Sequence, residues 1–168
     1  MMAVTPGGQF ASDTSAGVHP AAWEALSRAV AGFTPGYGTD DWTARATAAI
    51  RKLLELPNAA VFFVSTGTAA NALAIAHLSA PYDAVVCHAV AHIAVDECSA
   101  PAFFGHGTAL LPVPGEAGKL TPESVRTAAT RRTDVHHPRA KLLSITQSTE
   151  VGTVYSLDIE PEMVAATA

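Results

Sequence analysis

Residues 61–78 constrain the fold most, because they predict a strand, a tight polar turn and a helix in direct succession. The run Val61–Val64 holds large apolar residues, half of them β-branched, which is typical of a buried parallel strand. The Ala- and Leu-rich run Ala69–Leu78 favours a helix. The turn Thr66-Gly67-Thr68 would then lie at a helix N-terminus, where unpaired N–H groups can hold a phosphate. An ordinary turn with Thr68 as N-cap is the alternative interpretation.

Predicted strands and helices alternate along the chain, which is typical of an α/β fold with a parallel sheet. Four strands are predicted, at Ala60–Val64, Ala84–Cys87, Ala109–Val113 and Ala140–Ile145. Helices are predicted at Pro20–Val30, Trp42–Leu56, Thr68–Ser79, Pro122–Thr130 and Asp158–Ala168, and from Ala91 onward. The fold class is therefore α/β, a three-layer, mostly parallel sheet with helices on both faces. We expect residues 1–9 to be a mobile tail and residues 10–168 to form one domain.

Capping residues and turns follow from short motifs. Asp41 or Thr43 is predicted to cap the second helix. Thr121 is predicted to cap the helix that starts at Pro122, with an incomplete capping box because Ser124 stands where a glutamate is usual. Turns are predicted at 103–107 and 114–119.

Composition excludes several classes of partner. The formal net charge of −5 and the absence of a dense Lys/Arg cluster argue against nucleic acid. Apolar runs are interrupted before the about 20 residues that cross a bilayer, and no signal-peptide pattern opens the chain, so no membrane partner is expected. The two cysteines lack CxxC spacing, which favours a reduced, cytoplasmic compartment. Hydrophobic residues make up 49%, which favours extensive burial and subunit contacts.

Two histidine motifs and one tyrosine loop are candidate site features. His92 follows the strand predicted at 84–87, on the side where α/β sheets bind ligands, although a core or capping role is the alternative. Tyr37 lies in a glycine-rich turn, either as a platform over a ligand or as a surface residue. His136 and His137 could suggest a metal, but adjacent histidines rarely face one ion, and we predict no metal site.

The heptad Ser65-Thr66-Gly67-Thr68-Ala69-Ala70-Asn71 resembles the phosphate-binding turn of low-specificity L-threonine aldolases, pyridoxal 5'-phosphate (PLP) enzymes of the β-eliminating lyase superfamily. Further matches follow the same order, at Phe10–Thr14, Tyr37–Asp41 with Thr43, Ala91–Ile93, and His136–Arg139 with Lys141–Ile145. The resemblance implies the large domain of the aspartate aminotransferase-like fold (fold type I). It also implies that the chain is the N-terminal part of that domain, because the family's chain runs well beyond residue 168.

The resemblance also implies roles for individual residues. Thr66, Gly67 and Thr68 would bind the PLP phosphate, and His92 would stack on its ring as a catalytic residue. His136 would be the second catalytic residue, near the substrate hydroxyl, where an imidazole can accept or orient a proton near neutral pH. The substrate-binding residues would be Ser12, Tyr37 and His136. The loop 146–150 departs from the Glu-Asn-Thr-His-Asn that many members carry, so roles for Gln147 and Glu150 are implied only weakly.

PLP chemistry also needs a lysine amine to hold the cofactor and an acidic group for its ring nitrogen. Lys52, Lys119 and Lys141 do not fit the first role, and in the family both groups lie in the region after residue 168. The implied function is retro-aldol cleavage of a β-hydroxy-α-amino acid to glycine and an aldehyde. The implied assembly is a cytoplasmic homodimer or homotetramer with the site near a subunit boundary. Another β-eliminating amino-acid lyase, or a catalytically silent half-domain that binds or oligomerises, are the alternatives.

Overall fold

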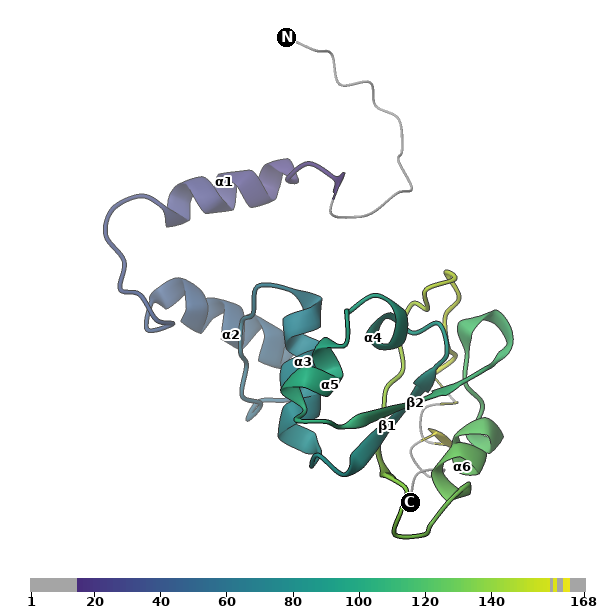
Figure 1. The fold of residues 1–168 in the computed structure, drawn as a ribbon. Helices are drawn as coiled ribbons and strands as arrows, with labels where there is room; N and C mark the ends of the chain where they lie inside the picture. The colour runs from purple at the N-terminus through teal and green to yellow at the C-terminus, as the bar shows by residue number, and fades with distance from the viewer. Residues whose placement is uncertain (1–14, 158, 160–161, 164–168) are drawn as a thin grey trace. The chain divides into compact units, whose positions relative to one another are not determined.

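A computed structural model describes residues 15–157, 159, 162 and 163 (Figure 1). The chain divides into two compact units, Met1–Phe62 and Phe63–Ala168, and each is described by itself. Ser12 and the predicted tail at residues 1–9 lie outside the described residues, as does most of the helix predicted from Asp158.

The first unit contains helices α1 (Pro20–Ala29) and α2 (Asp41–Leu53). Both were predicted, but α2 ends before Leu56, and its N-cap is Asp40 rather than Asp41 or Thr43. The Asp40 carboxylate accepts the Thr43 N–H (2.8 Å) and the Thr43 hydroxyl (2.7 Å), which lowers the pKa of Asp40. None of the described helices is long and apolar enough to cross a membrane.

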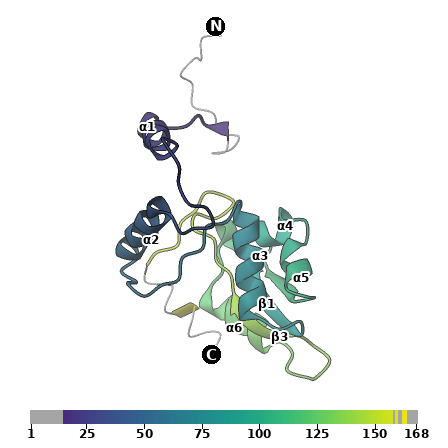
Figure 2. The ribbon, with the colours of Figure 1, turned by 90° about the vertical axis from the view of Figure 1, so that its left-hand side faces the viewer.

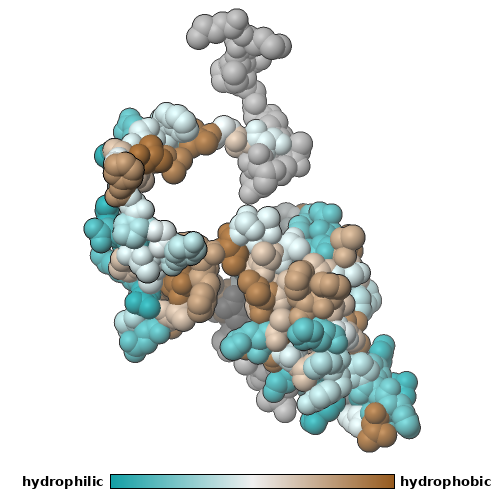
Figure 3. Space-filling model, turned by 60° about the vertical axis from the view of Figure 1, so that its left-hand side comes forward, coloured by the Kyte–Doolittle hydropathy of each residue, from teal (hydrophilic) through white to brown (hydrophobic). Residues whose placement is uncertain are grey.

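Helix α1 is amphipathic, as its sequence pattern predicts, and its apolar stripe is exposed. The stripe consists of Trp23, Leu26 and Val30, each at least half exposed. Figure 3 shows it as brown surface along the helix.

The segment at the boundary of the two units differs from the prediction. Residues 60–64 form no strand, and Phe62 and Phe63 are 83% and 56% exposed. No described strand pairs with this segment, and a buried strand needs a neighbour for its backbone N–H and C=O groups. Helix α3 (Gly67–Leu78) follows, and Thr66 rather than Thr68 is its N-cap.

A parallel three-stranded sheet follows α3. Its strands are β1 (Asp83–His88), β2 (Ala109–Val113) and β3 (Arg139–Leu143), in the order β2-β1-β3. The strands predicted at 84–87 and 109–113 are confirmed. The third ends at Leu143, two residues before the predicted Ile145. All of β1 is buried, because it is the central strand.

The two faces of β1 pack against different helices, which confirms the predicted three layers (Figures 1 and 2). Val85 and Cys87 pack with Ile75 of α3 and with residues at the start of α4 (His92–Val95). Val86 faces the opposite layer, which includes α6 (Pro122–Thr130). The core on that side consists of Val86, Leu120, Val125, Tyr155 and Met163.

Two connecting segments also form helical turns. Helix α5 (Ala100–Phe104) packs against α3 and includes the first residues of the turn predicted at 103–107. The predicted turn at 114–119 contains the 3-10 helix η2 (Glu116–Gly118). The capping box of α6 is complete, contrary to the prediction, because the Ser124 hydroxyl accepts the Thr121 N–H in place of a glutamate carboxylate.

The environments of the two cysteines predict different thiol reactivity. Cys87 is fully buried in β1, and burial raises its pKa to about 11, whereas Cys98 is exposed. Because the thiolate is the nucleophile, we expect iodoacetamide at pH 8 to alkylate Cys98 in the folded chain and Cys87 only in denaturant. Mass spectrometry of labelled peptides measures both. Equal labelling of the two thiols in the folded chain would contradict the buried position of β1.

Candidate active site

The carboxyl ends of the parallel strands gather several polar groups at one edge of the sheet. His88 ends β1, and the segments after β2 and β3 begin at the same edge. The N-terminus of α3 also lies there, because the C-terminal end of α3 leads into the start of β1. In Figure 1, α4 lies at this edge. This is the edge where open α/β sheets bind ligands.

The N-terminus of α3 is open to a ligand. The Thr66 hydroxyl accepts the Ala69 N–H (3.1 Å), and the Thr66 carbonyl accepts the Ala70 N–H (3.2 Å). Among the described residues, the N–H groups of Gly67 and Thr68 have no acceptor. A Cβ atom added at Gly67 would meet nothing within 4 Å. Two free N–H donors beside open space fit a phosphate group.

His92 begins α4 and is held by a carboxylate. Its Nδ1 lies 2.9 Å from Oε1 of Glu97, while its side chain is 41% exposed. Hydrogen bonding to Glu97 raises the pKa of His92, and the charges of Glu97, Glu150 and Asp96 act in the same direction. One side of the imidazole is therefore anchored, and the rest is available to a ligand.

Sequence reasoning missed Glu97 and Asn71. The Glu97 side chain is fully buried, and its Oε1 also accepts a hydrogen bond from Asn71 Nδ2 of α3 (2.6 Å). The available signal was the acidic pair Asp96-Glu97, four and five positions after His92.

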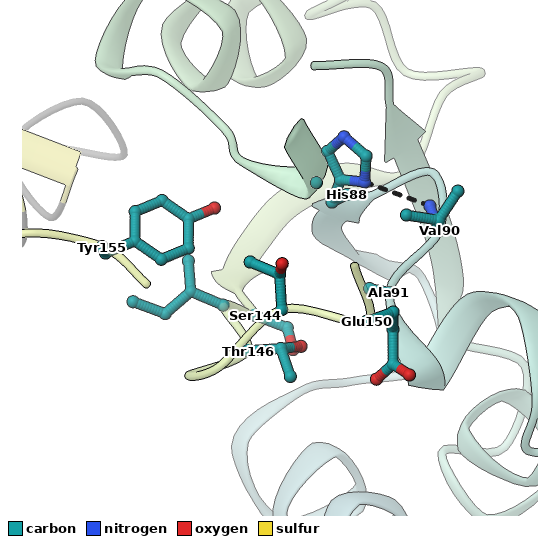
Figure 4. Close-up of a pocket in the computed structure, with 10 residues that line it drawn as sticks. His88, Val90, Ala91, Ser144, Thr146, Glu150 and Tyr155 are labelled. Carbon is teal, nitrogen blue, oxygen red and sulfur yellow. Dashed lines mark hydrogen bonds between the residues drawn. The ribbon is translucent and has the colours of Figure 1, made fainter. Parts of the chain in front are cut away.

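His88 has a structural role at the same edge. Its Nδ1 accepts the Val90 N–H (3.1 Å; Figure 4), and its Nε2 donates to the Gly115 carbonyl (3.0 Å). Both ring nitrogens therefore make hydrogen bonds to the backbone. His88 thus holds the turn that leads from β1 to α4.

The loop after β3 lines a small cavity at this edge of the sheet. Figure 4 shows Ser144, Thr146 and Glu150 near His88 and Ala91, around a cavity of about 10 Å³, which is the size of one water molecule. The Gln147 side chain bonds the backbone of Tyr155 through both its oxygen (2.8 Å) and its nitrogen (3.1 Å). The weakly implied ligand role of Gln147 is therefore not supported.

A larger hollow of about 280 Å³ lies beside α3 and β3. Its lining is mostly apolar, with Asn71 and Ser144 as polar members. Such a lining suits apolar groups and not a phosphate.

The structure does not bring His136 to His92 within one chain. Arg139 pairs with Asp83 at the start of β1, and His136 precedes Arg139 by three positions. His136 therefore lies at the amino edge of the sheet, whereas α4 lies at the opposite edge (Figure 2). The two histidines are separated within one chain because the chain crosses the sheet between them, and their roles in a site remain predictions.

The remaining candidate residues are described by the unit to which each belongs. Tyr37 belongs to the first unit, where its side chain is fully exposed and its backbone is left-handed (φ 62°). Among the described residues, no three His, Cys, Asp or Glu side chains are grouped to hold a metal. Lys119 is at the carboxyl edge, but its amine donates to the Val154 carbonyl. Lys52 lies in α2 of the first unit and Lys141 within β3.

The parallel sheet with helices on both faces places the chain in the class of α/β domains, which bind ligands at the carboxyl edge of the sheet. Comparison with known families is more specific. Residues 9–168 match the family described as Beta-eliminating lyase. The chain therefore belongs to the beta-eliminating lyase family.

Individual relatives agree with this assignment. The chain is 48% identical over 159 residues to low specificity L-threonine aldolases of Pseudomonas sp. (strain NCIMB 10558) and of Pseudomonas aeruginosa, covering 95% of this chain and 45% of each relative. A solved structure of Leishmania major threonine aldolase superposes with a TM-score of 0.85 at 32% identity, covering 90% of this chain and 44% of that one. The chain thus spans somewhat less than half the length of the relatives it matches.

Proposed function

We propose that this protein acts as a PLP-dependent aldehyde-lyase that cleaves a β-hydroxy-α-amino acid, such as threonine, to glycine and an aldehyde. The proposal is supported by the 48% identity to L-threonine aldolases across almost the whole chain. The observation that carries it is the open N-terminus of α3 together with His92 at the same edge of the sheet. In this proposal residues 10–168 form the N-terminal part of a PLP-binding large domain.

The residues present fit a bound PLP. The N–H groups of Gly67 and Thr68 and the hydroxyls of Thr66 and Thr68 would hold its phosphate, and the imidazole of His92 would cover its ring. Bound PLP supplies a conjugated ring that accepts the electrons released when the Cα–Cβ bond breaks. Glu97 keeps the imidazole in place while the ligand binds.

Ser12, Tyr37 and His136 remain proposed substrate-binding residues. Because His136 lies at the amino edge, it can reach a substrate only if that edge of one subunit approaches the carboxyl edge of another. This requirement agrees with the proposed homodimer or homotetramer, in which the site lies near a subunit boundary. A cytoplasmic location belongs to the same proposal.

The positions of the lysines favour a second candidate function. The Lys119 amine donates a hydrogen bond to the Val154 carbonyl, Lys52 lies in α2 of the first unit, and Lys141 lies within β3. These 168 residues would then bind PLP reversibly, without a covalent bond to lysine and without turnover. Borohydride reduction followed by mass spectrometry separates the candidates, because only a lysine-bound cofactor becomes fixed to a peptide.

The phosphate site is tested by replacing Gly67. We expect Gly67→Val to weaken PLP binding by about tenfold or more, or about 1.4 kcal/mol, because the branched side chain fills the space beside the free N–H groups. PLP binding is measured by absorbance titration. The matched control is Gly17→Val, since a Cβ at Gly17 also meets nothing within 4 Å and Gly17 lies in the first unit. Equal PLP affinity of the two variants would contradict the phosphate site.

A further inference from the structure

We infer that Glu97 is the positioning residue of this site, because one buried carboxylate oxygen joins His92 to α3, the helix whose N-terminus is the proposed phosphate site. The identity of the ligand over His92 rests on the proposed function, whereas the hydrogen-bond network does not.

The geometry defines one tautomer of His92. Oε1 of Glu97 lies 2.6 Å from Asn71 Nδ2 and 2.9 Å from His92 Nδ1. An ionised carboxylate only accepts hydrogen bonds, so Nδ1 of His92 carries a hydrogen in both charge states of the imidazole. Titration therefore takes place at Nε2. Hydrogen bonds to a charged acceptor are also stronger than neutral ones, so they fix the ring orientation.

The same carboxylate links the two halves of the proposed site. Asn71 is the fifth residue of α3, about one turn after the free N–H groups of Gly67 and Thr68. The bond to Asn71 thus holds His92 at a set position relative to the phosphate-binding end of the helix. A ligand that contacts both would meet a site that is already arranged.

Burial makes this arrangement rigid. The Glu97 side chain is fully buried, and its second oxygen, Oε2, has no hydrogen-bond partner among the described residues. Asn71 and His92 are therefore the two donors that compensate a desolvated charge. Loss of either donor would leave that charge poorly compensated, which is costly in a protein interior.

The charges that raise the pKa of His92 are all acidic. Glu97 is hydrogen-bonded to Nδ1, Asp96 lies 3.7 Å from Nε2 with an 80% exposed side chain, and Glu150 belongs to the loop after β3. Together they raise the pKa of His92, with Glu97 as the main cause. Because the pKa of His92 is higher in the folded chain than in the unfolded chain, protonated His92 stabilises the fold. This contribution is fully present at a pH below the unfolded pKa of about 6.5. That contribution is lost as the pH rises through the folded pKa.

The test is a pH titration of the His92 ring by NMR in the 168-residue chain without cofactor, with its signal assigned by its loss in His92→Gln. We expect Glu97→Gln to lower the pKa of His92, because the amide oxygen keeps the shape and the acceptor but not the charge. The matched control is Asp96→Asn, which removes an exposed carboxylate beside the same ring. A smaller decrease is expected there, because solvent screens exposed charges.

A decrease in Glu97→Gln no larger than that in Asp96→Asn would overturn the inference. Nitrogen chemical shifts of the wild-type ring provide a measurement that needs no variant. We expect the neutral ring to carry its hydrogen on Nδ1, and a hydrogen on Nε2 would equally overturn the inference. Neither measurement involves PLP, so failure of the chain to bind PLP would contradict the proposed function and leave the role of Glu97 standing.

Discussion

Replacing Gly115 with alanine is expected to lower the free energy of unfolding of the second unit by about 3 kcal/mol, near the upper end for overpacked sites. The added Cβ would overlap the backbone carbonyl of Lys119 and lie 3.3 Å from Cδ2 of His88. A backbone atom cannot rotate away as a flexible side chain can. The segment must therefore shift, and the hydrogen bond from His88 to the Gly115 carbonyl is disturbed with it.

This stability change can be measured through Cys87, whose buried thiol reports on the second unit. Pulse alkylation across a urea gradient gives the fraction of molecules in which β1 is exposed. Gly67→Ala is the matched control, since its Cβ meets nothing within 4 Å, and we expect a change within about 0.5 kcal/mol. If Gly115→Ala unfolds at the same urea concentration as Gly67→Ala, this result would contradict the close contact between Gly115 and the backbone of Lys119.

Replacing Leu120 with alanine is expected to cost about 3 kcal/mol, within the range for large-to-small changes in a core. Leu120 is 1% exposed and packs in the cluster formed by Val86, Val125, Tyr155 and Met163. Its backbone N–H bonds the Tyr155 hydroxyl (2.7 Å), which holds the local chain in place and limits collapse around the cavity. The cost therefore combines lost apolar burial with a cavity that does not close.

Leu157→Ala is the control for Leu120→Ala, because it removes the same atoms from a side chain that is 82% exposed. Its expected effect is within about 0.5 kcal/mol. Urea unfolding of both variants, followed by circular dichroism and by Cys87 labelling, makes the comparison. Similar losses for the two leucines would show that the layer formed by α6 and Leu120 is not a packed core.

Adjacent residues predicted correctly the helix starts and the strand that depend on short stretches of sequence. Pro20 and Pro122 open helices as expected, and the apolar run around Val85 forms a buried strand. Caps were less predictable. Asp40 and Thr66 are the N-caps of α2 and α3, where neighbouring residues had been predicted, and Ser124 completes a capping box that had been predicted to be incomplete. Several adjacent residues can accept the same N–H groups, and the backbone angles select among them.

The structure places the predicted site residues of the second unit at both edges of the sheet, and their roles remain predictions. The turn at Gly67 is open as the phosphate hypothesis requires, and His92 lies at the carboxyl edge as its position after a strand indicated. His136 lies at the amino edge, although its motif resembles that of a catalytic histidine. A motif identifies a residue type and its neighbours, but the strand direction decides at which edge the residue lies.

The sequence by itself determined the alternation of strands and helices, the glycine-centred turn before α3 and the family, because these depend on the order and type of neighbouring residues. The tertiary structure alone decided that residues 60–64 stay unpaired and that His136 is separated from His92. It also decided that Glu97 joins Asn71 and His92. Each of these depends on contacts between segments distant in the chain, where strand pairing and burial have no local sequence signature.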